Sequence, residues 1–184
     1  MQAVVDTCFL IDWAGYRRRE LLKSVFNRLL VPRQVLDEVR SERTAELVGR
    51  WLSEGFLYLA PVTRRVEEIA EAIARYAILN SRIPAVEEPE VYGLALAKAY
   101  SMPLLTENRG AVRLTQLYPE LRDIRVMRAL EVLALAIERR AIEAASREDV
   151  EKAFAEYIAD TKHRFPRKDL KDTVDRLCRV LFGS

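Results

Sequence analysis

The stretch Ala3-Val4-Val5-Asp6-Thr7 decides the fold that we predict for this chain. Its three apolar residues end at an acid, which is the pattern of a short buried strand with a polar residue at its carboxyl end. An acid in that position is buried or nearly so, and buried acids are rarely unpaired. We therefore expect Asp6 to belong to a site at the end of the first strand.

Strands and helices alternate along most of the chain. Short apolar runs predict further strands, and stretches with apolar residues every three or four positions predict helices. This alternation indicates a parallel sheet with helices on both faces. Residues 108–110 read as a turn. The predicted strands cover residues 3–5, 29–32, 56–62, 103–106 and 124–127, and the predicted helices cover residues 10–26, 34–51, 65–79, 90–100 and 130–141.

The last forty residues depart from this pattern. Ser146 opens a sequence that resembles a capping box, which predicts a helix to about residue 159. Residues 161–171 hold five cations, and Pro166 breaks the chain before a final helix with one apolar stripe. We therefore predict an α/β domain over residues 1–140 and a C-terminal helical hairpin over residues 141–184.

Length and composition are those of a globular protein. The chain has 184 residues, half of them hydrophobic and about a third charged, so it can bury a core without disulfides. No apolar run approaches the roughly 18 residues that span a bilayer, and no basic segment precedes Asp6. We expect no signal peptide, no membrane segment and a cytoplasmic protein.

Cysteine, histidine and net charge narrow the chemistry. Cys8 and Cys178 lie far apart and fit free thiols in a reducing compartment. His163 is the lone histidine, which excludes zinc–histidine clusters and argues against a Ser–His–Asp triad. The net charge of +2 neither demands nor excludes a nucleic-acid partner. The chemistry must therefore use carboxylates, hydroxyls and cations.

Arginine is far more frequent than lysine. The chain has 24 arginines and 6 lysines, and asparagine and glutamine together number 6. Many charges and few thermolabile amides are typical of thermophilic proteins. A GC-rich genome is the rival explanation.

Acids and hydroxyls gather where the predicted strands end. In open parallel sheets the functional side chains collect at the carboxyl ends of the strands. Acids from several distant segments are therefore expected to converge on one edge of the sheet. The candidates are Asp6 and Thr7 after the first strand, Asp37 and Glu38 after the second, Glu87, Glu88 and Glu90 around Pro89, and Thr106, Glu107 and Asn108 after the fourth.

Converging carboxylates are stable only when they are protonated or neutralised by a divalent cation. Ligands that are all oxygen favour Mg²⁺ or Mn²⁺, and such ions can cleave phosphodiesters without histidine. Some of these acids have simpler roles. Glu87 and Glu88 suit the first turn of a helix, and Asp12 and Asp37 read as solvated helix charges.

Four segments resemble the motifs of PIN domains, in the same order and spacing over roughly residues 1–140. Residues 4–11 (VVDTCFLI) resemble the opening strand, acid and helix, and residues 31–39 (VPRQVLDEV) resemble the second motif, which places a glutamate. Residues 90–97 (EVYGLALA) resemble the third motif, and residues 104–109 (LLTENR) the fourth. The resemblance implies a three-layer α/β/α sandwich with a parallel sheet of about five strands, to which the C-terminal helices are added.

The resemblance also implies a Mg²⁺- or Mn²⁺-dependent ribonuclease that acts on single-stranded RNA. By position, the acidic metal ligands would be Asp6, Glu38 and Glu90. The fourth motif usually ends in aspartate, but Asn108 stands there and offers a metal an amide oxygen without charge. Glu107 is the candidate substitute for the missing charge. Thr7 and Thr106 would orient a ligand or water through their hydroxyl groups.

Several functions stay open at this point. The nuclease would be either the toxin of a toxin–antitoxin pair, held by a small antitoxin, or an RNA-processing enzyme. The alternative is a catalytically impaired PIN module that binds RNA or a protein partner, which Asn108 favours. Other α/β enzymes fit poorly, since Gly-x-Gly-x-x-Gly and P-loop motifs are absent. Cys8 also stands where an aspartyl-phosphate phosphatase needs its second aspartate.

The basic segment of the C-terminal hairpin is the candidate RNA-binding surface. Cations there would contact phosphates without regard to sequence, and Phe165 would add stacking. The other interpretation is a solvated turn between two helices. PIN domains often form dimers, so a homodimer is the expected assembly. The candidate RNA-binding residues are Lys162, Arg164, Arg167 and Lys168.

Overall fold

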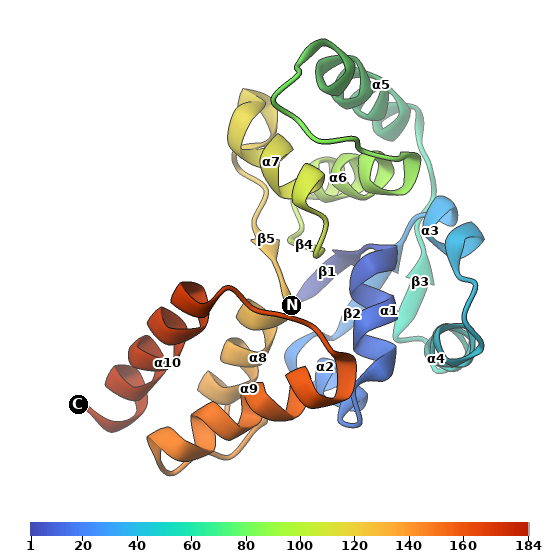
Figure 1. The fold of residues 1–184 in the computed structure, drawn as a ribbon. Coiled ribbons are helices and arrows are strands. Elements are labelled where there is room, and N and C mark those ends of the chain that lie inside the picture. The colour runs from blue at the N-terminus through green and yellow to red at the C-terminus, as the bar shows by residue number, and fades with distance from the viewer. Residues whose placement is uncertain (184) are drawn as a thin grey trace.

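A computed structural model describes residues 1–183 of the chain, which are built around one parallel sheet (Figure 1). The five strands lie in the order β3-β2-β1-β4-β5, so the strand that ends at Asp6 is the central one and β2 and β4 flank it. The predicted parallel sheet is confirmed. The strands are β1 (Gln2–Val5), β2 (Arg28–Val31), β3 (Leu57–Leu59), β4 (Leu104–Leu105) and β5 (Val126–Met127).

Helices cover the sheet on both faces. They are α1 (Thr7–Gly15), α2 (Leu22–Val25), α3 (Arg33–Glu38), α4 (Glu42–Ser53), α5 (Arg64–Leu79), α6 (Glu88–Tyr100), α7 (Arg109–Leu117), α8 (Ala129–Glu138), α9 (Arg147–Thr161) and α10 (Arg167–Phe182), with 3-10 turns at Arg19–Leu21 and Pro119–Leu121. Figure 1 shows α5, α6 and α7 together on one side of the sheet and α8, α9 and α10 on the other.

The apolar side chains form two clusters, one for each face of the sheet. Within β1, Val4 packs with α5, α6 and α7, whereas Ala3 and Val5 pack with α1, α4, α8, α9 and α10. This split follows from the strand, in which successive side chains point to opposite faces. The chain therefore forms the three-layer α/β/α sandwich predicted from its sequence.

Two predicted helices are interrupted in the structure. Residues 10–26 divide into α1 and α2, and residues 34–51 divide into α3 and α4. In the second case Ser41 starts a new helix, because its Oγ accepts a hydrogen bond from the backbone nitrogen of Thr44 at 3.2 Å. The break matters for function because it leaves Glu38 at the end of the short helix α3.

The turn predicted at residues 108–110 is wrong, since this segment begins helix α7. Asn108 is the N-cap residue, and its Oδ1 accepts a hydrogen bond from the backbone nitrogen of Ala111 at 3.0 Å. Gly110 serves close packing instead of a turn. A Cβ there would lie 2.9 Å from Cγ2 of Val86 and 3.0 Å from Oδ1 of Asn108.

The C-terminal helices α9 and α10 form the predicted hairpin and pack on the sheet domain. Phe154 and Tyr157 of α9 and Leu177 of α10 belong to the same apolar cluster as the β1 side chains Ala3 and Val5. The boundary proposed near residue 140 falls between α8 and α9, and a division into two units there stays a prediction. Among residues 1–183, no helix is long and apolar enough to cross a bilayer.

Candidate active site

The sheet brings the first and fourth sequence motifs side by side. Val5 and Leu105 are paired residues of the adjacent parallel strands β1 and β4, so the next residues, Asp6 and Thr106, are neighbours at the carboxyl ends. The backbone continues this pairing, because the nitrogen of Asp6 donates to the carbonyl of Leu105 at 3.1 Å. The fold thus juxtaposes two residues that are 100 positions apart.

Asp6 is the most deeply buried acid of the site, with 1% of its surface exposed. Its Oδ1 accepts a hydrogen bond from the backbone nitrogen of Phe9 at 2.9 Å and so caps α1. Its Oδ2 accepts a hydrogen bond from the hydroxyl of the fully buried Thr106. Burial raises the pKa of Asp6 to about 7, and repulsion from Glu90 and Glu107 acts in the same direction.

A chain of hydrogen bonds leads from Asp6 to Glu90. Thr106 Oγ1 accepts from the backbone nitrogen of Asn108 at 2.9 Å, and Asn108 Nδ2 donates to Glu90 Oε1 at 2.9 Å. The other oxygen of Glu90 accepts from the backbone nitrogen of Glu87 at 2.9 Å, which closes the capping box of α6. Burial and repulsion from Glu38 raise the pKa of Glu90.

Glu38 joins the site through Thr7. The hydroxyl of Thr7, the first residue of α1, donates to Glu38 Oε2 at 2.7 Å. Thr7 is buried and follows Asp6 directly, so this bond holds the end of α3 next to the end of β1. The structure therefore brings Asp6, Glu38 and Glu90 to the same edge of the sheet, together with both threonines.

The carboxylate oxygens of these acids are suitable ligands for a divalent cation. Within residues 1–183 no lysine, arginine or histidine forms an ion pair with Asp6, Glu38 or Glu90. The raised pKa values of Asp6 and Glu90 show that their charged forms are unfavourable there. As placed in this part of the chain, no three Asp, Glu, Cys or His side chains are grouped tightly enough to enclose a metal. Their oxygens are bonded to protein donors instead.

Asn108 uses both ends of its amide within the protein. Its oxygen caps α7, and its nitrogen binds the carboxylate of Glu90. An aspartate here would cap the helix equally well, but it would add a fourth negative charge to the three acids of the site, which already repel one another. The asparagine therefore lowers the charge of the site, and its role as a metal ligand stays a prediction.

Glu107 points to a different set of partners. Its Oε1 accepts from the backbone nitrogen of Ala129 at 2.6 Å, at the start of α8, and its Oε2 lies 3.5 Å from His163 Nε2. Burial raises the pKa of Glu107. The side chain proposed as the substitute for the missing aspartate thus binds α8 and the C-terminal segment, and a catalytic role for it stays a prediction.

His163 and Asp12 are site neighbours that the sequence analysis missed. His163 Nδ1 lies 2.8 Å from Oδ2 of Asp12, and this hydrogen bond raises the pKa of His163. Asp12 is therefore paired, although its sequence pattern suggested a solvated helix charge. No local signal could have found the pair, because the two residues are 151 positions apart.

The predicted RNA-binding residues do not share one environment. Lys162 Nζ donates to the carbonyl of Ala159 at 2.9 Å, whereas Arg167 and Lys168 are exposed in the first turn of α10. Arg164 lines a pocket of about 310 Å³ beside Glu107. Phe165 is half-buried and stacks on Tyr157 with ring centroids 5.8 Å apart, so its ring anchors the segment to α9.

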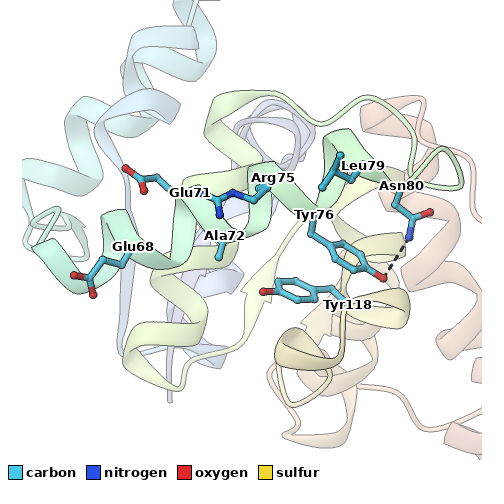
Figure 2. Close-up of a pocket in the computed structure, with 8 residues that line it drawn as sticks. All are labelled: Glu68, Glu71, Ala72, Arg75, Tyr76, Leu79, Asn80 and Tyr118. Atoms are coloured by element: carbon cyan, nitrogen blue, oxygen red, sulfur yellow. Dashed lines mark hydrogen bonds between the residues drawn. The ribbon is translucent and has the colours of Figure 1, made fainter.

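A larger hollow lies away from these acids, on the outer side of α5 (Figure 2). It has a volume of about 580 Å³, and none of the acids at the ends of β1 and β4 lines it. Tyr76 and Tyr118 stack at its edge with ring centroids 4.3 Å apart, and Figure 2 shows both rings lying side by side. Its lining carries no set of converging acids.

Comparison with known proteins agrees with the fold. No curated protein matches the chain. A family model described as a PIN domain matches residues 2–177, which includes α9 and most of α10 as well as the sheet domain. PIN domains are generally nucleases that use divalent metals, so the family gives this site a nuclease-type fold. The parallel sheet, the four motifs and this match together show that the chain belongs to the PIN-domain family.

Proposed function

We propose that this protein is a Mg²⁺- or Mn²⁺-dependent endoribonuclease that hydrolyses phosphodiester bonds of single-stranded RNA. The observation that carries the proposal is the line of hydrogen bonds from Asp6 through Thr106 and Asn108 to Glu90, with Glu38 attached through Thr7. It gathers three acids that have no cationic partner among the described residues. Such a set suits a divalent cation, since burial and mutual repulsion raise the pKa of Asp6 and Glu90 and a bound cation would stabilise their charged forms.

Each residue has a distinct part in this proposal. Asp6, Glu38 and Glu90 would hold the cation, which supplies neutralisation of phosphate charge and a more acidic water when it is bound. The hydroxyl of Thr106 orients the carboxylate of Asp6, and the hydroxyl of Thr7 orients that of Glu38. Asn108 holds Glu90 and keeps the charge of the site at three acids.

The test is a cleavage assay with a matched pair of variants. Mixed-sequence single-stranded RNA is incubated with the protein in Mn²⁺, in Mg²⁺ and in EDTA. Glu38→Gln removes one charge but keeps an oxygen that can accept from Thr7, so the fold should persist. Asp37→Asn is the control, because Asp37 is the preceding residue, is exposed and pairs only with Arg33 at 3.7 Å.

We expect metal-dependent cutting that Asp37→Asn leaves within threefold. Glu38→Gln should lose at least about 100-fold, since even changes to the partners of metal ligands typically lose 10–100-fold. Cutting that persists in EDTA and in Glu38→Gln would contradict the proposal. Equal loss in both variants would show that the effect comes from helix α3 and not from the acid.

One observation favours a second function, a PIN module that binds RNA or a protein partner without cutting. The amide of Asn108 occupies the fourth-motif position and donates to Glu90, so one negative charge is missing from the site. Under this alternative, the protein binds RNA with equal affinity in Mn²⁺ and in EDTA and leaves it intact. Asn108→Asp would then restore cutting, because it restores the acid while keeping the helix cap.

Partners extend the same proposal. As a toxin, the nuclease would be held by a small antitoxin, and a short reading frame next to the gene would support this role. As an RNA-processing enzyme it would act alone or as a homodimer, which light scattering after gel filtration would measure. We also expect the protein to reside in the cytoplasm and to come from a thermophilic organism.

A further inference from the structure

A pocket lined by Glu107 gathers several cationic side chains close to the acid site. It has a volume of about 310 Å³, at the lower end of the range for ligand pockets. Helix α7 forms one wall and the segment that joins α9 to α10 forms another. Its cationic lining residues are Arg109, Arg113, Arg128, His163 and Arg164.

Three of these arginines are free to bind an anion. Arg109, Arg113 and Arg164 are exposed and form no ion pair within residues 1–183, and Arg113 only bonds Gln116, at 3.1 Å. Arg128 is already balanced by Glu131 and by Asp169 of α10, at 3.1 Å and 3.2 Å. The free charge of the pocket thus comes from α7 and from the C-terminal segment.

The one acid that lines the pocket does not offset this charge. Glu107 is largely enclosed, with 12% of its side chain exposed, and both of its oxygens face partners: Ala129 and His163. His163 in turn lies against Asp12 on α1. Three guanidinium groups therefore face one acid that already has its own partners, which leaves the pocket with net positive charge.

The packing fixes where Arg164 stands. Its neighbours on either side are anchored, His163 by Asp12 and Phe165 by the rings of Phe154 and Tyr157. The backbone at Arg164 is therefore fixed on the same pocket that Arg109 of α7 lines. On the opposite wall, Arg109 directly follows Asn108, whose amide contacts Glu90, so the pocket adjoins the acid site.

We propose that this pocket binds a phosphodiester group of single-stranded RNA adjacent to the bond at the acid site, through Arg109, Arg113 and Arg164. Guanidinium groups recognise phosphate oxygens through paired hydrogen bonds and do so without regard to sequence. The C-terminal hairpin thus supplies one side of the substrate path. This inference rests on the proposed function but concerns binding, which is measured separately from cutting.

The expected effect follows from counterion release. On a single strand each phosphate contact changes the slope of log affinity against log salt by about 0.7, which is a factor of about five in affinity at 0.1 M salt. Arg109→Gln and Arg164→Gln should each weaken binding about fivefold. The double variant should weaken it about 25-fold and reduce the salt slope by about 1.4.

The experiment measures fluorescence anisotropy of a labelled mixed-sequence single-stranded RNA in EDTA, over a range of salt concentrations. The matched control is the double variant Arg122→Gln/Arg125→Gln. Both arginines are exposed, form no ion pair in the described part of the chain and precede β5, so they lie towards the amino ends of the strands. Circular dichroism checks that every variant keeps the helical content of the wild type.

The proposal is supported if the Arg109/Arg164 double variant loses affinity and salt slope while the Arg122/Arg125 control stays within twofold. It is overturned if both double variants lose equally, if neither loses, or if the wild type binds no RNA up to 100 μM. Cleavage in Mn²⁺ is scored on the same proteins. RNA binding through the pocket without any cutting would contradict the nuclease and leave this inference standing.

Discussion

The replacement Asp6→Asn should make the metal-free protein more stable at pH 8 while it abolishes cutting. The pKa of Asp6 is about 7 in the folded protein, against 3.8 for an ordinary aspartate, because the carboxyl group is buried. The folded state therefore holds a proton between these values that the unfolded state has lost. The contribution of the Asp6 carboxyl group to the free energy of unfolding is fully present below pH 3.8 and is lost as the pH rises through 7.

The size of the effect follows from those two values. The difference between 3.8 and about 7, at about 1.4 kcal/mol per pH unit, corresponds to about 4 kcal/mol of stability that wild type has lost once the pH exceeds 7. The asparagine carries no charge, and its oxygen can still cap α1 through the nitrogen of Phe9. We expect a net gain of about 2–4 kcal/mol at pH 8, after the loss of one charged hydrogen bond to Thr106.

Guanidinium unfolding of wild type, Asp6→Asn and the exposed control Asp37→Asn in EDTA at pH 5 and pH 8 measures this directly. Wild type and the control should be less stable at pH 8 than at pH 5, and Asp6→Asn should lack that component of the change. Adding Mn²⁺ at pH 8 should stabilise wild type, by about 2.7 kcal/mol at 100 times the dissociation constant, and should not stabilise Asp6→Asn.

Two results would refute this reasoning. If Asp6→Asn is less stable than wild type at pH 8 in EDTA, the buried carboxylate is not a destabilising charge. If all three proteins share one pH profile, Asp6 does not titrate in this range. Stabilisation of Asp6→Asn by Mn²⁺ equal to that of wild type would remove Asp6 from the metal ligands.

Three further predictions concern the surroundings of the site. Gly110→Ala should destabilise the protein by about 1–3 kcal/mol in chemical unfolding, because the new Cβ would press on the Asn108 amide, whereas Gly49→Ala, with nothing within 4 Å of its Cβ, should not. His163→Gln should destabilise the protein by about 1.5 kcal/mol below pH 6 and by less at pH 9. The bond to Asp12 raises the pKa of His163, so the stability that the charged imidazole contributes is lost as the pH rises through this pKa. A destabilisation that is independent of pH would contradict this. Burial raises the pKa of Cys8 to about 12, so this thiol should react with iodoacetamide at pH 8 at least 100-fold more slowly in folded than in unfolded protein. Equal rates in the two states would show that the thiol ionises freely.

The sheet and its strand ends could be read from the sequence because their signals are local. A short apolar run that ends at Asp6 marks β1, and Thr106 follows an equally clear run at β4. Since parallel strands place their carboxyl ends on one edge, the fold class puts both residues on the same edge of the sheet, and the strand order of the structure makes them neighbours. The structure adds the hydrogen bond between them.

Other features depended on contacts that no local pattern encodes. The dipeptide Arg109-Gly110 after Asn108 signals a turn, but the glycine is needed because Val86 packs against the start of a helix. The side on which Glu107 points depends on where α8 begins, since Ala129 supplies the donor that it binds. The anchoring of His163 to Asp12 likewise depends on how the hairpin returns to α1.

The residues of this site also begin the helices of the fold: Asp6 starts α1, Glu90 closes the first turn of α6, and Asn108 starts α7. A helix N-terminus accepts an asparagine as readily as an aspartate. Loss of the negative charge at an N-cap such as Asp6 therefore leaves the helix cap in place, and selection for stability alone would not preserve that acid. If this chain is the nuclease proposed above, single amide substitutions could take it from cutting RNA to merely binding it, without passing through an unstable intermediate sequence.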